Sequence, residues 1–302
     1  MVAKVKCPDY DSKRIIQEIV RDRVKQRDFF VSLEDDWLEQ LDLYILKEGD
    51  PFFVKPLELG RHISKERVEE ERQKAFDART QSSDPLSRLL KKRKANLIGL
   101  YKPEAGSDLH TKLSEMRRKN KLRVCPSCGE DGAPGTLDHY LPKEVFPELS
   151  IFFQNLTPMC DQCQGKKGTS YKNSTGGKRF FHPYYDDIND CFFHIKISPP
   201  YEAPIKFELQ IVRCEPKQIK TLISHVIGVG LQERIEEYCE SMHEGLIDVF
   251  SEDPSSTSTV DRVKDFYALE SKKSPNAWGA IYYKSVLNTP ELLEYLDGLR
   301  AE

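Results

Sequence analysis

Four cysteines form two Cys-x-x-Cys pairs near the middle of the chain. The first pair is Cys125 and Cys128, and the second is Cys160 and Cys163. Each spacing directs two sulfurs toward one point, and four thiolates suit the tetrahedral shell of Zn²⁺, with Zn–S distances of about 2.3 Å. In a chain whose N-terminus shows no secretory signal, such pairs indicate metal rather than disulfides. Four thiolates leave no open position on the ion, so we expect a structural zinc.

The segment between the two pairs carries an acid beside a base. Asp138 and His139 lie among the 31 residues that separate the pairs, more than a zinc ribbon usually needs. A neutral imidazole, with a pKa near about 6.5, can take a proton from water at cellular pH. A carboxylate is a hard ligand for a divalent cation, and Asn155 can orient the base. The candidates for contacts with phosphate are Lys143, Lys166 and Lys167. This set predicts phosphodiester hydrolysis.

These segments resemble a known motif. "CPSC", "LDHYLPK" and "QNLTPMCDQCQGKKG" are similar to the zinc-stapled HNH endonuclease motif, the ββα-metal finger. The resemblance covers about residues 125–168. The coinciding positions are Cys125, Cys128, Asp138, His139, Pro142, Asn155, Leu156, Cys160, Cys163 and Lys167.

The resemblance implies a role for each residue. His139 would be the general base, Asp138 would hold a catalytic Mg²⁺ or Mn²⁺, and Asn155 would hold the loop that aims His139. Where the family has Asn or His as the second ligand of this ion, this chain has Gln164. A glutamine carbonyl can also bind Mg²⁺, but its side chain is one methylene longer. His182 is the possible substitute ligand.

The rest of the chain must position this centre. Apolar periodicity and cap signals predict helices over 11–28, 32–48, 64–80, 85–101, 107–121, 217–227, 231–250, 259–271, 276–287 and 290–300. Alternating runs at 191–198 and 205–212 predict a strand pair. We therefore expect an α+β, mostly helical chain. Its predicted parts are an N-terminal helical region (1–122), an HNH core (123–180) and a C-terminal α/β extension (181–302).

Charge and hydropathy bear on the partners. The 302 residues carry a net charge of −3, but basic runs at 91–94 and 117–123 could form a phosphate track. Nothing in the sequence indicates a reader of bases, so we expect little sequence specificity. No apolar run reaches the length of a membrane span. We therefore expect a cytoplasmic protein that binds DNA and no membrane.

These observations favour a metal-dependent endonuclease that cuts DNA, similar to the nucleases of bacterial antiphage defence and restriction systems. Such nucleases are often held by a regulatory partner such as an ATPase, and this chain has no phosphate-binding Gly-Lys-Ser/Thr loop of its own. Two alternatives remain: a catalytically inactive zinc module that binds nucleic acid or a protein partner, and a nuclease that cuts RNA. Taken singly, His139 could be an ordinary strand histidine, Asn155 a turn cap and the lysines surface charge.

Overall fold

The structure of this chain is a computed structural model that describes residues 4–77, 84–186, 193–252 and 257–300. It is an α+β, predominantly helical fold with two small antiparallel sheets, as the sequence predicts. Among these residues, no helix combines the length and the apolar character needed to cross a membrane.

The first part of the chain is helical. Its elements are α1 (Ser12–Asp22), α2 (Arg27–Leu46), a 3-10 turn (Leu59–His62), α3 (Lys65–Asp77), α4 (Pro85–Gly99) and α5 (Asp108–Arg118). Two of the predicted helix starts are confirmed by their caps. Asp84 accepts a hydrogen bond from Ser87 N at 2.9 Å, and Ser107 accepts one from His110 N at 3.2 Å. The predicted helix over 64–80 ends in residues outside the described ranges.

The boundary between α1 and α2 differs from the prediction. The helix expected over 11–28 ends at Asp22, and Gln26 adopts a left-handed conformation (φ 61°) immediately before α2. Ser32 therefore lies inside α2 rather than at its start. The physical reason is the core, because Phe29 and Phe30 are both fully buried and draw the turn before Ser32 into the helix.

The middle of the chain forms a strand–strand–helix unit. β1 (Thr136–His139) pairs antiparallel with β2 (Leu156–Met159), so that His139 lies opposite Leu156. α6 (Asp161–Lys167) follows β2 directly, as the sequence indicates. Two 3-10 turns, Pro147–Leu149 and Phe153–Asn155, lie in the connection between the strands.

The last part of the chain packs helices against a strand pair. β3 (Phe193–Ser198) and β4 (Lys206–Ile211) are antiparallel, as predicted, although the expected residues 191 and 192 lie outside the described ranges. The helices are α7 (Ile219–Gly228), α8 (Leu231–Ser251), α9 (Thr259–Ser271), α10 (Trp278–Leu287) and α11 (Pro290–Leu299).

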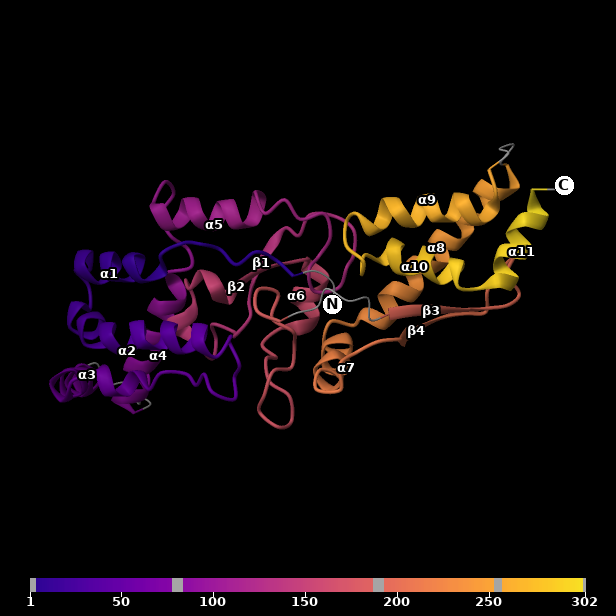
Figure 1. The fold of residues 1–302 in the computed structure, drawn as a ribbon. Coiled ribbons are helices and arrows are strands. Elements are labelled where there is room, and N and C mark those ends of the chain that lie inside the picture. The colour runs from indigo at the N-terminus through magenta and orange to yellow at the C-terminus, as the bar shows by residue number, and fades with distance from the viewer. Residues whose placement is uncertain (1–3, 78–83, 187–192, 253–256, 301–302) are drawn as a thin grey trace.

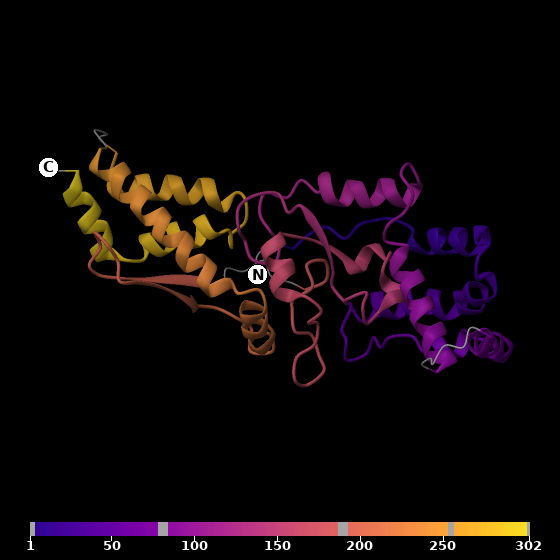
Figure 2. The same cartoon turned by 180° about the vertical axis from the view of Figure 1, so that it is seen from behind.

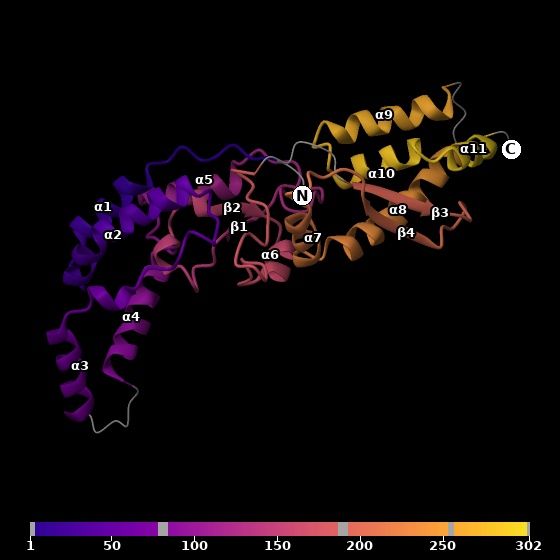
Figure 3. The ribbon, with the colours of Figure 1, turned by 60° about the horizontal axis from the view of Figure 1, so that its bottom comes forward.

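The strand–strand–helix unit lies at the centre of an elongated molecule. α1–α5 extend from one side of it, and β3, β4 and α8–α11 extend from the other (Figure 1, and from behind in Figure 2). α3 and the adjoining part of α4 project away from the body as an arm (Figure 3). One cluster of buried apolar side chains runs from α1 through the central unit to α11. The central unit is therefore braced from both sides.

Candidate functional site

The four paired cysteines meet at one point. The sulfur atoms of Cys125, Cys128, Cys160 and Cys163 all lie within 4.8 Å of one another. The Sγ atoms of Cys128 and Cys160 are 3.8 Å apart, and a tetrahedron with Zn–S bonds of about 2.3 Å has sulfurs about 3.8 Å apart. The predicted gathering of four thiols is confirmed, and they can hold a zinc ion.

Backbone hydrogen bonds hold both cysteine pairs in position. In the first pair, Gly129 N donates to Cys125 O at 2.9 Å and closes a tight turn, in which Gly129 has a φ of 90°. In the second pair, Cys160 caps α6, and its Sγ accepts from Cys163 N at 3.5 Å. Cys160 N in turn donates to Cys125 Sγ at 3.4 Å. These N–H groups lower the cost of gathering thiolates.

An ion pair fixes α6 to β1. Lys167 Nζ lies 2.8 Å from Asp138 Oδ2 and donates to His139 O at 2.9 Å. The contact with Asp138 is an ion pair without a hydrogen bond, because Oδ2 has no hydrogen-bond donor in suitable geometry among the described residues. Burial raises the pKa of Asp138, and the Lys167 charge opposes that rise. Lys167 is buried and does not present its ammonium to a phosphate, whereas Lys166 on the same helix is exposed.

His139 is held in one tautomer. Its Nε2 lies 2.9 Å from Ser150 O. A carbonyl oxygen can only accept, so Nε2 carries the proton and Nδ1 keeps its lone pair. Burial lowers the pKa of His139 to about 3. The imidazole is therefore neutral at cellular pH, with Nδ1 as the nitrogen that can accept a proton.

Tyr101 covers this imidazole. The rings of Tyr101 and His139 meet edge to face, with centroids 4.5 Å apart, and the Tyr101 hydroxyl donates to Leu137 O at 3.3 Å. Only 6% of the surface of His139 is exposed. Access to the ring therefore requires a movement of Tyr101 or of the segment between α4 and α5 that carries it. Nothing in the sequence marks Tyr101 for this position.

Cations surround the covered histidine. Lys143 Nζ lies 4.9 Å and Arg117 Cζ 5.2 Å from the centroid of the Tyr101 ring. After burial, the charges of Lys143, Lys167 and Arg117 further lower the pKa of His139. Arg117 is the first residue of the basic run at 117–123, so one end of this run reaches the centre.

Asn155 ties together the loop that follows β1. Its Oδ1 accepts from Leu141 N at 2.8 Å and from the Tyr44 hydroxyl at 3.1 Å. Its Nδ2 donates to Leu141 O at 2.9 Å and to Leu149 O at 3.3 Å. The amide is fully buried. Asn155 therefore fixes the chain two residues beyond His139.

His182 is joined to Asn155 through the Tyr44 hydroxyl in one buried network. Its Nε2 lies 2.9 Å from the Tyr44 hydroxyl, and its Nδ1 accepts from Tyr184 N at 3.2 Å. A Cβ on Gly49, whose φ is 67°, would lie 2.8 Å from the Tyr44 hydroxyl and 3.1 Å from the His182 ring. Both nitrogens of His182 are thus engaged, so it offers no free nitrogen to a metal.

Asp138, Gln164 and His182, which are the residues predicted to bind a catalytic divalent ion, each make other contacts in this structure. The carboxylate of Asp138 is paired with the Lys167 ammonium. Gln164 Nε2 donates to Leu137 O at 3.3 Å, and His182 is engaged elsewhere. Among the described residues, the four cysteines are the group of metal-ligating side chains that converges. The four cysteines can therefore hold a zinc ion, and the binding of Mg²⁺ or Mn²⁺ by the other predicted ligands stays a prediction.

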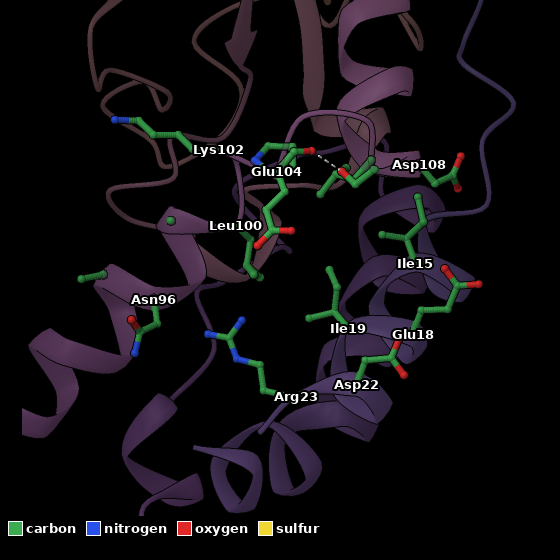
Figure 4. Close-up of a pocket in the computed structure, with 15 residues that line it drawn as sticks. Ile15, Glu18, Ile19, Asp22, Arg23, Asn96, Leu100, Lys102, Glu104 and Asp108 are labelled. Carbon is green, nitrogen blue, oxygen red and sulfur yellow. Dashed lines mark hydrogen bonds between the residues drawn. The ribbon is translucent and has the colours of Figure 1, made fainter. Parts of the chain in front are cut away.

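A cavity of about 700 Å³ is lined in part by the segment between α4 and α5 (Figure 4). Ile15 and Ile19 of α1 line it together with Leu100 and Lys102, the two neighbours of Tyr101. None of the predicted site residues lines this cavity. The cavity therefore adjoins the backbone that carries Tyr101, but it does not adjoin His139 itself.

Comparisons with known proteins find two local similarities. The chain is 39% identical to protein ea31 of Escherichia phage lambda over 70 residues, which are 23% of each chain. It is 36% identical to Septu protein PtuB of Bacillus thuringiensis over 62 residues, 20% of this chain and 24% of that protein. The chain thus matches about a quarter of the length of these relatives. No family model matches, and no solved structure matches.

Proposed function

We propose that this chain is an HNH-type endonuclease that hydrolyses phosphodiester bonds in DNA, with a structural zinc at its four cysteines. The observation that carries the proposal is the state of His139. Its Nε2–H is fixed on Ser150 O, and its Nδ1 lone pair is left to accept a proton once Tyr101 moves aside. A neutral imidazole held in one tautomer is the arrangement that a general base requires.

In the proposed reaction, water attacks phosphorus while its proton passes to Nδ1 of His139. A bond from phosphorus to the water oxygen forms and the bond to the 3′ oxygen breaks, and the departing 3′ oxygen takes a proton from solvent. Lys143 and Arg117, both beside the Tyr101 ring, supply positive charge for the phosphates that flank the cut. Because these are contacts of charge rather than of base edges, we propose little sequence specificity.

The biological setting is also a proposal. The resemblance to nucleases of antiphage defence systems and the local similarity to Septu protein PtuB support a role against foreign DNA in the bacterial cytoplasm. A regulatory partner such as an ATPase would then decide when the covered His139 is opened. His139 is nearly closed to solvent, which suits a nuclease that waits for a signal.

A second candidate is a zinc module that binds nucleic acid without cutting it. The Lys167–Asp138 ion pair favours it, because an ammonium lies beside the carboxylate that a catalytic ion would use. A nuclease that cuts RNA is a further alternative, since the same chemistry serves both polymers.

One cutting assay separates these functions. The purified chain is incubated with supercoiled plasmid and with a structured RNA, in Mg²⁺, in Mn²⁺ and in EDTA. The proposal expects plasmid cutting and little RNA cutting. Binding of plasmid without cutting in every buffer would favour the zinc module, and preferential loss of RNA would favour the RNase.

A further inference from the structure

The proposed zinc site has a cationic neighbour that comes from a distant part of the chain. Arg234, in the first turn of α8, directs its guanidinium at the cysteine cluster. Its Nη1 donates to Cys163 Sγ at 3.3 Å, and its Nη2 donates to Cys128 Sγ and Cys160 Sγ, both at 3.7 Å. One side chain thus contacts three of the four sulfurs.

Other groups fix the direction of the guanidinium. Nη2 donates to Glu130 Oε2 at 2.5 Å, and Nη1 donates to Val229 O at 3.3 Å. The guanidinium lies over the Trp278 ring, 5.3 Å from its centroid. These three contacts hold the guanidinium without help from the sulfurs. Its N–H groups are therefore already directed at the sulfurs before they become thiolates.

The C-terminal helices also hold the first cysteine turn directly. Trp278 Nε1 donates to Cys128 O at 2.6 Å, and His225 Nε2 donates to Ser127 O at 2.8 Å. Trp278 N donates to Gly129 O at 3.2 Å. The turn that presents two of the sulfurs is therefore built against α7 and α10, and Arg234 completes this contact from α8.

The charges explain why a cation is needed here. Four thiolates around Zn²⁺ leave a net charge of −2, and burying that charge is costly without a partner. N–H donors to the sulfurs reduce the electron density that protons, oxidants and competing ligands attack. Cys125 Sγ receives Cys160 N instead, so each of the four sulfurs has an N–H donor.

Arg234 also reaches the surface beside the sulfurs. It lines a pocket of about 330 Å³ together with Glu130 and Trp278, and 13% of its side chain is exposed. The zinc centre is therefore close to solvent on this side, where Cys160 is partly exposed as well.

We propose that Arg234 is a positioning residue of the zinc centre, which neutralises the thiolates and controls how fast zinc is lost to ligands from solvent. This inference rests on the proposed zinc site and not on nuclease activity. Arg234→Met keeps a straight apolar stem over Trp278 and removes the charge. Arg234→Lys keeps a charge that cannot reach three sulfurs at once. Arg72→Met, an exposed arginine on α3 paired with Glu69, is the control for an equal loss of charge.

The experiment follows zinc release from each full-length protein to a chromogenic chelator at pH 7.5. We expect release to be about tenfold faster in Arg234→Met, intermediate in Arg234→Lys and unchanged in Arg72→Met. The melting temperature of Arg234→Met should fall further in the zinc-loaded form than in the zinc-stripped form, because only the loaded form holds four thiolates for the guanidinium to neutralise. A parental release rate in Arg234→Met would overturn the inference, as would an equal fall in melting temperature in both forms. A purified parent that contains no zinc would overturn the zinc site itself and this inference with it, whatever the cutting assay shows.

Discussion

The Lys167 ammonium lies 2.8 Å from the Asp138 carboxylate, and the two side chains are 1% and 7% exposed. The pair joins β1 to α6 across 29 positions of sequence, and it places a fixed positive charge where the family resemblance implies a divalent ion. In this conformation the carboxylate is a structural anion. Its availability to a metal depends on whether Lys167 moves when substrate arrives.

Removal of one partner from this ion pair should destabilise the fold strongly. Lys167→Met leaves a buried carboxylate without its counter-ion, which costs about 3–5 kcal/mol at pH 7. The double variant Asp138→Asn/Lys167→Met should recover part of this loss, because no buried charge remains. Urea unfolding measures both. Equal destabilisation in the single and double variants would show that the two charges are not coupled.

Asn155 should be required for the loop after His139. Asn155→Ala leaves Leu141 N and the carbonyls of Leu141 and Leu149 without their partner, which costs on the order of 3 kcal/mol. Gln154→Ala, one residue earlier, is the control. The free energy of unfolding, measured with denaturant, and the cutting rate should both fall in Asn155→Ala and stay near the parental values in Gln154→Ala. Stability near that of the parent would contradict the hydrogen-bond account.

Glu148 should make stability depend on pH. Burial raises its pKa from 4.5 to about 7. The folded carboxyl holds its proton more tightly than the unfolded one, so its contribution is full below about pH 4.5 and is lost as pH rises to about 7. The loss is about 3 kcal/mol.

Glu148→Gln cannot ionise and can keep the acceptor for Leu57 N. The variant should therefore lose less stability than the parent between pH 4.5 and 7, and it should be the more stable protein at pH 8. Thermal unfolding across this pH range measures the difference. Parallel curves for the two proteins would contradict the assignment.

Zinc content and stability should fall together when one thiolate is removed. Cys160→Ser takes one ligand from the cluster, and we expect its zinc content to drop well below that of the parent. Cys214→Ser, a partly exposed cysteine outside the cluster, is the matched control. Elemental analysis and melting temperature report the two effects. Full zinc content in Cys160→Ser would contradict the four-thiolate shell.

Local signals in the sequence predict much of this fold. Amphipathic periods and caps such as Asp84 and Ser107 mark the helices within a few residues, and the doubled cysteine spacing predicts the thiol cluster. The break at Gln26 has no such signal, because it depends on Phe29 and Phe30 entering a core built by other segments.

The remaining features of the site depend on contacts between distant residues. Tyr101 covers a histidine 38 positions later, and Arg234 reaches Cys163 across 71 positions. The type of each residue is ordinary in its own helix or loop. Such contacts follow only from the packing of the whole chain. For this reason the sequence predicts the cysteine cluster and His139, but it predicts neither Tyr101 over His139 nor Arg234 beside the sulfurs.

The proton-accepting role of His139 is tested most directly by plasmid cutting with His139→Ala, beside His194→Ala as a histidine control in β3. We expect the parent and His194→Ala to convert supercoiled plasmid to nicked or linear forms. Cutting by His139→Ala should be lost at a temperature at which the variant is folded and its zinc content is near that of the parent. Equal cutting by the parent and His139→Ala would contradict the account.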